Sequence, residues 1–322
     1  VNFELWLGES DAAEYLDELT KIYEESNVLI ESEGAQIIEV KEDSDTSPMP
    51  PLLFKRSNGT VSYETTDLAT ILQRQKEIKP DEIWYCVDAR QGLHFDQVFR
   101  AARKVKLIED KVVLEHIGFG TMNGKDGKPF KTRDGGVMSL KGLIALVEEE
   151  TRKKINPDTV EEDMREEVAK TVAIAALKYA DLLPFRGTDY IFEPEKFADL
   201  EGKTGPYLLY STIRMKSLLT KGENFEKGKI TKFKSETEKD IALTVLRLPT
   251  ILNKALDSRS LNDITEYIYK LTSLYNKFYA ENKILTEEDK ELQKSWLTLT
   301  KIVYDINMTL LDVLAIKVPE KM

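Results

Sequence analysis

The residues best suited to chemistry lie at positions 118–140, where glycines and fixed cations alternate. The segment reads Gly-Phe-Gly-Thr-Met-Asn-Gly-Lys-Asp-Gly-Lys-Pro-Phe-Lys-Thr-Arg-Asp-Gly-Gly-Val-Met-Ser-Leu and follows a predicted apolar strand over residues 112–117. Glycine lets the backbone approach a ligand closely, and lysine or arginine beside it suits a polyphosphate. Loops of this composition are also common as solvated connectors, so chemistry alone leaves both interpretations open.

A second polar group follows the predicted turn at Asn58-Gly59. We expect a helix to begin at Thr65 or Thr66, because either residue is a good N-cap. Asp67 would then lie in the first helical turn, where the helix dipole favours a carboxylate. An acidic helix start is the ordinary explanation of such an aspartate.

A third group, Asp88, Gln91 and His94, comes where an aromatic and β-branched strand gives way to a helix. In open parallel sheets, ligands gather at the carboxyl ends of the strands, so these side chains are well placed to bind one. The alternative is that Gln91 is an exposed loop residue and His94 a partly buried helix residue. Cys86, on the strand itself, is predicted to be a small buried hydrophobe.

The secondary-structure elements that must position these groups differ between the first and second parts of the chain. Up to about residue 120, strands and helices alternate as in βαβ units. The predicted strands are 3–5, 36–40, 52–56, 83–87 and 111–117, and the predicted helices are 11–25, 66–76 and 96–104. Beyond residue 140 the apolar spacing is helical nearly throughout, with helices predicted over 140–155, 158–182, 205–220, 236–257, 259–281 and 287–315.

The chain has 41% hydrophobic and 32% charged residues, which is enough apolar side-chain volume for packed cores. The net charge of −11 argues against indiscriminate nucleic-acid binding. The cations are nevertheless segregated, because residues 212–235 carry seven Lys or Arg against two Glu. That run favours either a shaped RNA-binding surface or a solvated connector between helices.

The sequence of residues 118–140 resembles the divergent KMSKS loop of arginyl-tRNA synthetases, which often reads FKTRSG in that family. The resemblance implies that Lys128, Lys131 and Arg133 are catalytic and meet the β- and γ-phosphates of ATP. Thr132 stands where the second KMSKS lysine belongs, which leaves open which cation takes its place.

Other residues of the first half match the same family. Tyr63 and Asp67 resemble its Tyr-x-x-x-Asp pair for substrate arginine, a task that suits a carboxylate because a guanidinium offers parallel donors. Gln91 is placed by the resemblance in the same amino-acid pocket. The residues that the resemblance implies for ATP are Asp88, His94, Gly118, Phe119 and Gly120.

The helical part carries further signatures. Gly205-Pro-Tyr-Leu-Leu-Tyr210 resembles the start of the family's anticodon-binding domain, and residues 310–322 resemble its carboxyl terminus. Unpaired bases stack on aromatic side chains, so we expect contacts to tRNA from these aromatics, although aromatics at helical spacing are more often core. The candidates are Tyr207, Tyr210, Phe278 and Tyr279.

The implied fold class is α/β plus all-α, the second half of a Rossmann-like class I synthetase catalytic domain followed by a helical anticodon-binding bundle. The predicted domains are the catalytic half with its KMSKS-like loop (1–140), a helical linker that contacts the tRNA stem (141–204) and a DALR-type anticodon-binding domain (205–322). The two histidines, His94 and His116, cannot form the family's His-x-Gly-His signature. We therefore expect a carboxy-terminal part of a longer enzyme, inactive by itself.

The implied function is an arginine–tRNA ligase that uses ATP and Mg²⁺, with tRNA(Arg) and arginine as partners. We expect a cytoplasmic monomer with no membrane association and no protein-bound metal. Two alternatives remain open from sequence. One is a tRNA-binding or regulatory paralogue that never aminoacylates, and the other is an unrelated nucleotide-dependent enzyme. The second is disfavoured because the chain contains no Gly-x-x-x-x-Gly-Lys-Ser/Thr match.

Overall fold

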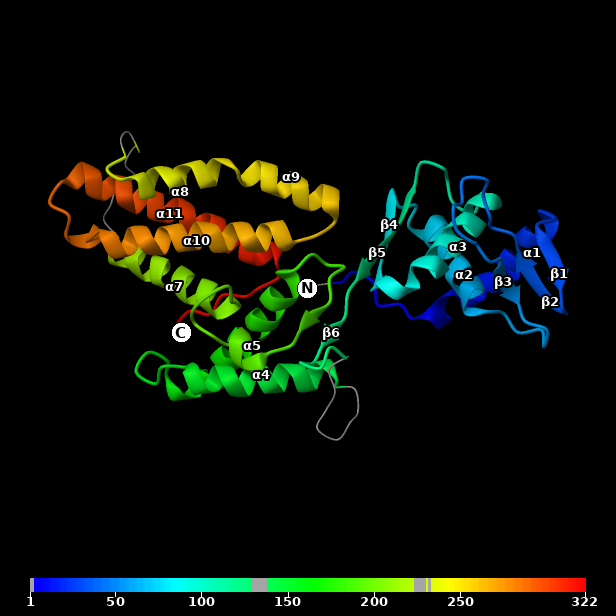
Figure 1. The fold of residues 1–322 in the computed structure, drawn as a ribbon, viewed down its shortest axis with the longest axis horizontal. Coiled ribbons are helices and arrows are strands. Elements are labelled where there is room, and N and C mark those ends of the chain that lie inside the picture. Colours follow the sequence, from blue (N-terminus) through cyan, green and yellow to red (C-terminus); the bar gives the residue numbers. More distant parts are fainter. Residues whose placement is uncertain (1–2, 129–137, 223–229, 231–232) are drawn as a thin grey trace. The chain divides into compact units, whose positions relative to one another are not determined.

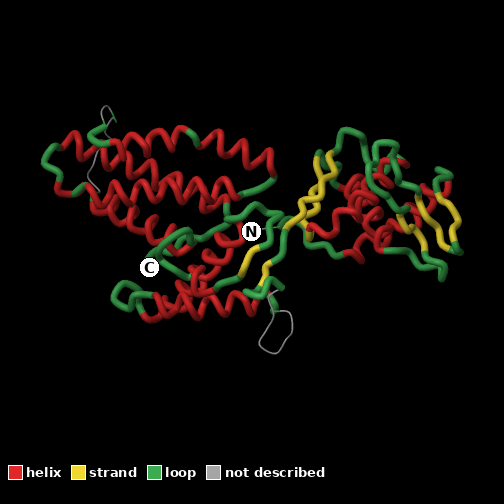
Figure 2. Tube along the Cα trace, viewed as in Figure 1, coloured by secondary structure: helices red, strands yellow, loops and turns green. Residues whose placement is uncertain are grey.

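The computed structural model describes residues 3–128, 138–222, 230 and 233–322. It divides into two compact units, residues 1–119 and 120–322, which we call the α/β unit and the helical unit (Figure 1). Figure 2 shows short strands beside helices in the first unit and long helices throughout most of the second.

The α/β unit holds an antiparallel sheet of three strands and a parallel pair. Its helices and strands are the 3₁₀-helix η1 (Glu9–Tyr15), α1 (Leu16–Glu25), β1 (Leu29–Ser32), β2 (Ala35–Ile38), β3 (Leu52–Lys55), α2 (Tyr63–Glu77), β4 (Glu82–Asp88), the 3₁₀-helix η2 (Ala89–Gln91), α3 (Gly92–Lys104) and β5 (Val113–Phe119). The predicted βαβ alternation is thus present between β4 and β5, with α3 as its crossover.

Several local expectations for this unit were wrong in detail. Residues 3–5, expected to be a strand, form none. The helix that carries Asp67 begins at Tyr63, with Ser62 as its N-cap, because the Ser62 hydroxyl accepts a hydrogen bond from Thr65 N at 3.3 Å. Asp67 therefore lies in the second helical turn. Strand β1 was missed, although Glu33 and Gly34 both have positive φ (51° and 80°), the mark of a tight hairpin turn.

The parallel pair β4–β5 has one covered face and one open face within its unit. Tyr85 packs its ring 4.7 Å from that of Phe95, so α3 covers the first face. On the other face Trp84 is 47% exposed and Cys86 is also exposed. The predicted burial of Cys86 is therefore wrong, since the strand alternates between covered and open positions.

The helical unit is built around a long-helix bundle. Its helices and strands are β6 (Met122–Asn123), α4 (Leu140–Lys154), the 3₁₀-helix η3 (Glu162–Met164), α5 (Arg165–Leu182), β7 (Tyr190–Ile191), α6 (Pro194–Phe197), α7 (Gly205–Lys221), α8 (Glu236–Leu246), α9 (Leu248–Ser258), α10 (Asn262–Glu281), the 3₁₀-helix η4 (Ile284–Thr286) and α11 (Lys290–Val313). The single helix predicted over 236–257 divides at Arg247, because Pro249 stands in the first turn of α9 and lacks an N–H.

A large apolar core joins helices α5, α7, α10 and α11 of the bundle, with Tyr179, Leu208, Tyr275 and Leu311 fully buried in it. Gly205 permits the closest approach within this core. A Cβ at that position would lie 2.4 Å from the carbonyl oxygen of Ala175, so α5 and α7 could not pack as they do with any larger residue there. None of the helices in the described residues combines the length and apolar character that a bilayer crossing needs.

Candidate functional site

Asp67, His94 and Tyr63 form one cluster in the α/β unit. Asp67 and Tyr63 stand on α2, and His94 reaches them from α3. The His94 Nε2 lies 2.6 Å from the Asp67 Oδ2, and the Tyr63 ring stacks on the imidazole with centroids 4.6 Å apart and planes 21° apart. The structure thus joins two residues predicted for arginine with one predicted for ATP.

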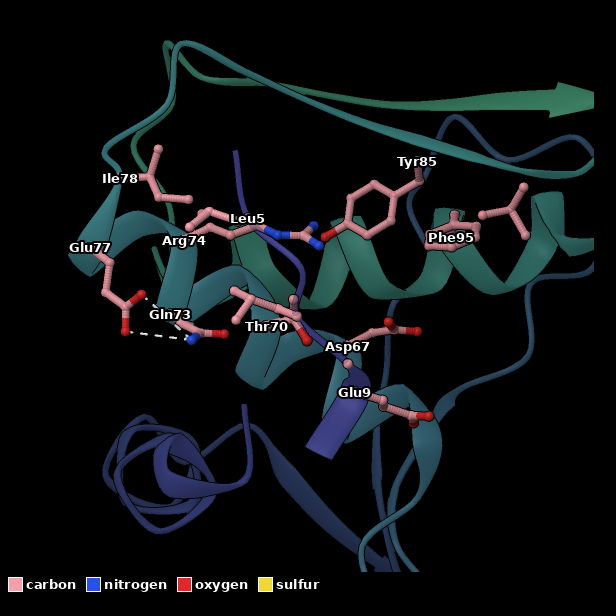
Figure 3. Close-up of a pocket in the computed structure, with 13 residues that line it drawn as sticks. Leu5, Glu9, Asp67, Thr70, Gln73, Arg74, Glu77, Ile78, Tyr85 and Phe95 are labelled. Carbon is pink, nitrogen blue, oxygen red and sulfur yellow. Dashed lines mark hydrogen bonds between the residues drawn. The ribbon is translucent and has the colours of Figure 1, made fainter. Parts of the chain in front are cut away.

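Asp67 also lines a cavity of about 390 Å³, which we call the Asp67 cavity (Figure 3). Its charged lining consists of the carboxylates of Glu9, Asp67 and Glu77 and the guanidinium of Arg74. Glu77 accepts hydrogen bonds from Tyr15 at 2.6 Å and from Gln73 at 3.4 Å, both neutral donors. Carboxylates outnumber cations in this lining, so the cavity favours a cationic ligand.

Tyr85 and Arg74 also line the cavity. Figure 3 shows the Arg74 side chain extending toward the Tyr85 hydroxyl, and its guanidinium carbon lies 5.1 Å from the ring centre. The Tyr85 hydroxyl is buried, and its interaction with the Arg74 side chain opposes the effect of burial on its pKa. Burial raises the pKa of Tyr85 to about 12, so the hydroxyl keeps its proton and can donate to a ligand.

Asp88, Gly118 and Phe119 meet at the carboxyl edge of the parallel pair, where Val87 pairs with Gly118 and Asp88 with Phe119. Hydrogen bonds from the Arg90 side chain lower the pKa of Asp88 to about 2. Close packing restricts position 118 to glycine, because a Cβ there would lie 3.0 Å from the Cα of Ala89. Gln91 is exposed at the end of η2.

Gly120 and Lys128 belong to the helical unit. Gly120 donates its N–H to the Arg186 carbonyl at 2.8 Å, and a Cβ there would lie 2.6 Å from the backbone of Thr188, so packing already requires a glycine. Lys128 is exposed beside a tight turn in which Gly127 has a φ of +72°. Lys131 and Arg133, predicted to be catalytic with Lys128, lie outside the described residues, as does Thr132.

A second cluster stands on α7 and α10 of the helical unit, and we call it the Tyr–Arg surface: Tyr207, Tyr210, Arg214, Asn276 and Tyr279. The Arg214 guanidinium lies 4.8 Å from the Tyr279 ring centre and 5.7 Å from that of Tyr210. Arg214 also donates to Asn276 Oδ1, while Asn276 Nδ2 donates to the Tyr207 hydroxyl at 2.8 Å. Tyr210 is 44% exposed, so its ring is accessible to a base.

Phe278, expected to stack on a base, is completely buried in the helical core. Its ring packs edge-on against Trp296 at 5.9 Å and stabilises the bundle, so burial argues against that role. Sequence reasoning also missed members of both clusters. The spacing of Tyr210 and Arg214, one turn apart on α7, is the signal that could have found Arg214. For Arg74 and Tyr85 the sequence offers no such signal, because they face each other from different elements.

The described residues contain no group of three or more His, Cys, Asp or Glu that could hold a metal ion.

Comparisons with known proteins agree on one family. The family model described as "tRNA synthetases class I (R), catalytic domain" matches residues 1–194, and the DALR anticodon binding domain matches residues 208–322. The chain is 43% identical to the "Arginine--tRNA ligase" of Agathobacter rectalis over all of its length and 56% of that protein. It thus spans little more than half the length of this curated relative.

Solved structures share the fold. The arginyl-tRNA synthetase of Plasmodium falciparum superposes with a TM-score of 0.80 at 23% identity, covering 99% of this chain and 54% of that one. The Thermus thermophilus arginyl-tRNA synthetase gives a TM-score of 0.80 at 21% identity, covering 98% of this chain and 59% of that one.

An α/β unit with a ligand cluster beside its parallel strands, followed by a DALR-type helical bundle, defines a class I aminoacyl-tRNA synthetase. Within that class, the catalytic-domain family model and the relative of 43% identity are both those of arginine enzymes. The chain belongs to the arginyl-tRNA synthetase family. An unrelated nucleotide-dependent enzyme is thereby excluded.

Proposed function

We propose that this chain supplies the arginine-binding and anticodon-binding parts of a cytoplasmic arginine–tRNA ligase. Such an enzyme joins the carboxylate of arginine to the α-phosphorus of ATP and releases pyrophosphate. It then transfers the arginyl group to the terminal ribose of tRNA(Arg) and releases AMP. The observation that carries the proposal is the Asp67 cavity, in whose lining carboxylates outnumber cations.

In the proposed reaction Asp67 binds the guanidinium of the substrate. A carboxylate accepts the parallel N–H donors of a guanidinium in a paired, charge-assisted arrangement that an ammonium cannot reproduce. Tyr63, which stacks on His94, and Gln91 are also proposed to contact arginine, although neither lines the Asp67 cavity itself. Catalysis would come from positioning and from stabilisation of phosphate charge, without a covalent enzyme intermediate.

The nucleotide is proposed to lie along the carboxyl edge of β4 and β5, at Asp88, Gly118 and Phe119, with Gly120 following. Lys128, Lys131 and Arg133 are the cations proposed to meet its β- and γ-phosphates. Mg²⁺ is proposed to arrive with ATP, bound to the phosphates. His94, predicted to contact the nucleotide, forms a hydrogen bond with Asp67.

Binding of tRNA(Arg) is proposed for the Tyr–Arg surface. Its exposed tyrosine ring offers a stacking face, and Arg214 offers positive charge beside it. Stacking on aromatic rings and attraction to the backbone are the two terms that bind unpaired bases. Tyr207, Tyr210 and Tyr279 are therefore the residues proposed to contact the anticodon loop.

The test is aminoacylation of tRNA(Arg) with labelled arginine and ATP. This chain alone is compared with a protein in which it replaces the matching 56% of the Agathobacter rectalis relative. We expect charging by the hybrid protein and none by the chain alone. A folded hybrid that binds tRNA(Arg) but never charges it would overturn the enzymatic proposal and favour a tRNA-binding paralogue.

A further inference from the structure

We propose that His94 is a positioning residue, which holds the Asp67 carboxylate in the orientation that faces an incoming guanidinium. The inference rests on the proposed function, because it takes arginine as the ligand of the Asp67 cavity. It assigns His94 a role through Asp67 rather than a contact with substrate or nucleotide.

The first support is where the two side chains stand. Asp67 lines the cavity, whereas His94 does not and is only 8% exposed. The Asp67 side chain is 28% exposed. The imidazole therefore lies behind the carboxylate, and a ligand entering the cavity reaches Asp67 first.

The second support is the way the imidazole is held. Tyr63 stacks on one face at 4.6 Å, and Phe95 meets the ring edge-on at 4.9 Å with an interplanar angle of 77°. These contacts fix the ring plane and therefore the direction of its Nε2. Because the bond to Asp67 joins α3 to α2, it also sets the rotamer of the carboxylate relative to both helices.

The third support is the proton that this hydrogen bond requires. A carboxylate only accepts hydrogen bonds, so the proton between Asp67 and His94 sits on Nε2. The His94 Nδ1 is buried without a partner in the described residues, so Nε2 is the nitrogen that this hydrogen bond engages.

The N–H at Nε2 is enough to hold the Asp67 carboxylate in place. A lysine or arginine in place of His94 would hold the carboxylate equally well, but it would cancel the charge that attracts a guanidinium. Oδ2 gives one acceptor site to His94 and keeps a second, and Oδ1 keeps both of its sites, so a paired contact with a guanidinium is still available. The arrangement thus separates orientation, supplied by His94, from attraction, supplied by Asp67.

The experiment compares arginine affinity by calorimetry in the 322-residue chain and three variants. His94→Leu removes the donor, and His94→Gln retains an N–H at a similar reach. His116→Leu is the matched control, because His116 also stacks on Phe95, at 5.0 Å, yet makes no contact with Asp67 among the described residues. Citrulline, which lacks the positive charge of arginine, is titrated as the reference ligand.

We expect His94→Leu to weaken arginine binding about 10- to 100-fold, the usual range for loss of a hydrogen bond to a charged group. His94→Gln should recover most of that loss, and His116→Leu should match the wild type. Long-range ¹⁵N NMR of the two histidines should show His94 protonated at Nε2. That signature should change in Asp67→Asn, in which the partner is no longer an anion.

Three outcomes overturn the inference. A folded His94→Leu chain with wild-type arginine affinity would do so while leaving the proposed function intact. His94→Gln as weak as His94→Leu, with both folded, would show that the ring is needed for its shape and not for its donor. If the wild-type chain binds arginine no better than citrulline, the proposed function of the cavity fails and this role fails with it.

Discussion

The Asp67 cavity and the Tyr–Arg surface are assembled from opposite kinds of groups. The cavity gathers carboxylates, and the hydrogen-bond donors bound to Asp67 and Glu77 are His94, Tyr15 and Gln73. The surface instead gathers aromatic rings and a guanidinium, and the Asn276 amide of α10 holds Tyr207 and Arg214 through hydrogen bonds. The first arrangement suits a small cation in an enclosed space, and the second suits a large polyanion with exposed bases.

The two sites differ so much that the net charge of the chain is a poor guide to the ligands that it can bind. A net charge of −11 opposes nucleic-acid binding by the chain as a whole. Arg214 nevertheless lies beside tyrosine rings on the pair of helices α7 and α10. Because the two sites lie in different units, each with its own core, the chemistry of one can be altered without the other. The following substitutions use that separation.

The largest effect is expected from Asp67→Asn, which keeps the shape of the side chain and removes its charge. Loss of one partner of a buried charged pair costs about 2–5 kcal/mol of binding free energy, so arginine affinity should fall at least about 30-fold. Affinity for tRNA(Arg), measured by filter binding on the same preparation, should not change. Equal losses of both affinities would mean that the two sites are not separate.

Gly205→Ala should act on the helical unit alone. The added methyl group would lie 2.4 Å from the Ala175 carbonyl oxygen, and overpacking of this kind costs about 1–3 kcal/mol of stability. Hydrogen exchange should quicken in α5 and α7 and stay unchanged in α2 and α3. Gly187→Ala is the control, since its Cβ would meet only the Phe185 ring, at an ordinary 3.5 Å. Similar destabilisation by both substitutions would contradict the close approach of α5 and α7.

Arg214→Gln should weaken tRNA(Arg) binding about 5- to 30-fold, as expected for loss of a cation held between aromatic rings. Lys170→Gln removes the same charge from an exposed position on α5 and should have a smaller effect. Arginine affinity should be unaltered in both variants. If Lys170→Gln weakens tRNA binding as much as Arg214→Gln, overall charge and not the Tyr–Arg surface governs binding.

The smallest effect is expected on the acid stability of the α/β unit. Hydrogen bonds from the Arg100 guanidinium, 2.7 and 2.8 Å long, lower the pKa of Asp45 from 3.8 to about 2. A lowered native pKa means that the ion pair stabilises the fold above pH 3.8 and that this contribution is lost as the pH falls toward 2. Asp45→Asn should flatten the pH dependence of unfolding in that window, whereas Asp43→Asn should leave it steep.

Local sequence signals predicted much of the fold. The helices that became α3, α7, α10 and α11 were expected within a few residues of their bounds, because their apolar spacing is regular. Errors arose where a single residue determines the end of a helix. Ser62 sets the start of α2, and Pro249 sets the division between α8 and α9. The exposure of Cys86 depends on what covers a sheet face, which no local pattern records.

The candidate site was predicted only in part for a similar reason. Tyr63 and Asp67 are close in sequence and share a motif, so they could be paired without a structure. The bond between Asp67 and His94 spans 27 positions, and the approach of Arg74 to Tyr85 joins a helix to a strand. Such contacts are set by packing between elements, so their geometry appears only when the chain is folded.

The central claim is that Asp67 makes the cavity a guanidinium site. Calorimetric titration of the wild-type chain with arginine and with citrulline tests it most directly, because the two amino acids have nearly the same shape and differ in charge. The account predicts that arginine binds and that citrulline binds at least about tenfold more weakly. Equal affinities, or no heat from either ligand in a chain shown to be folded, would contradict it.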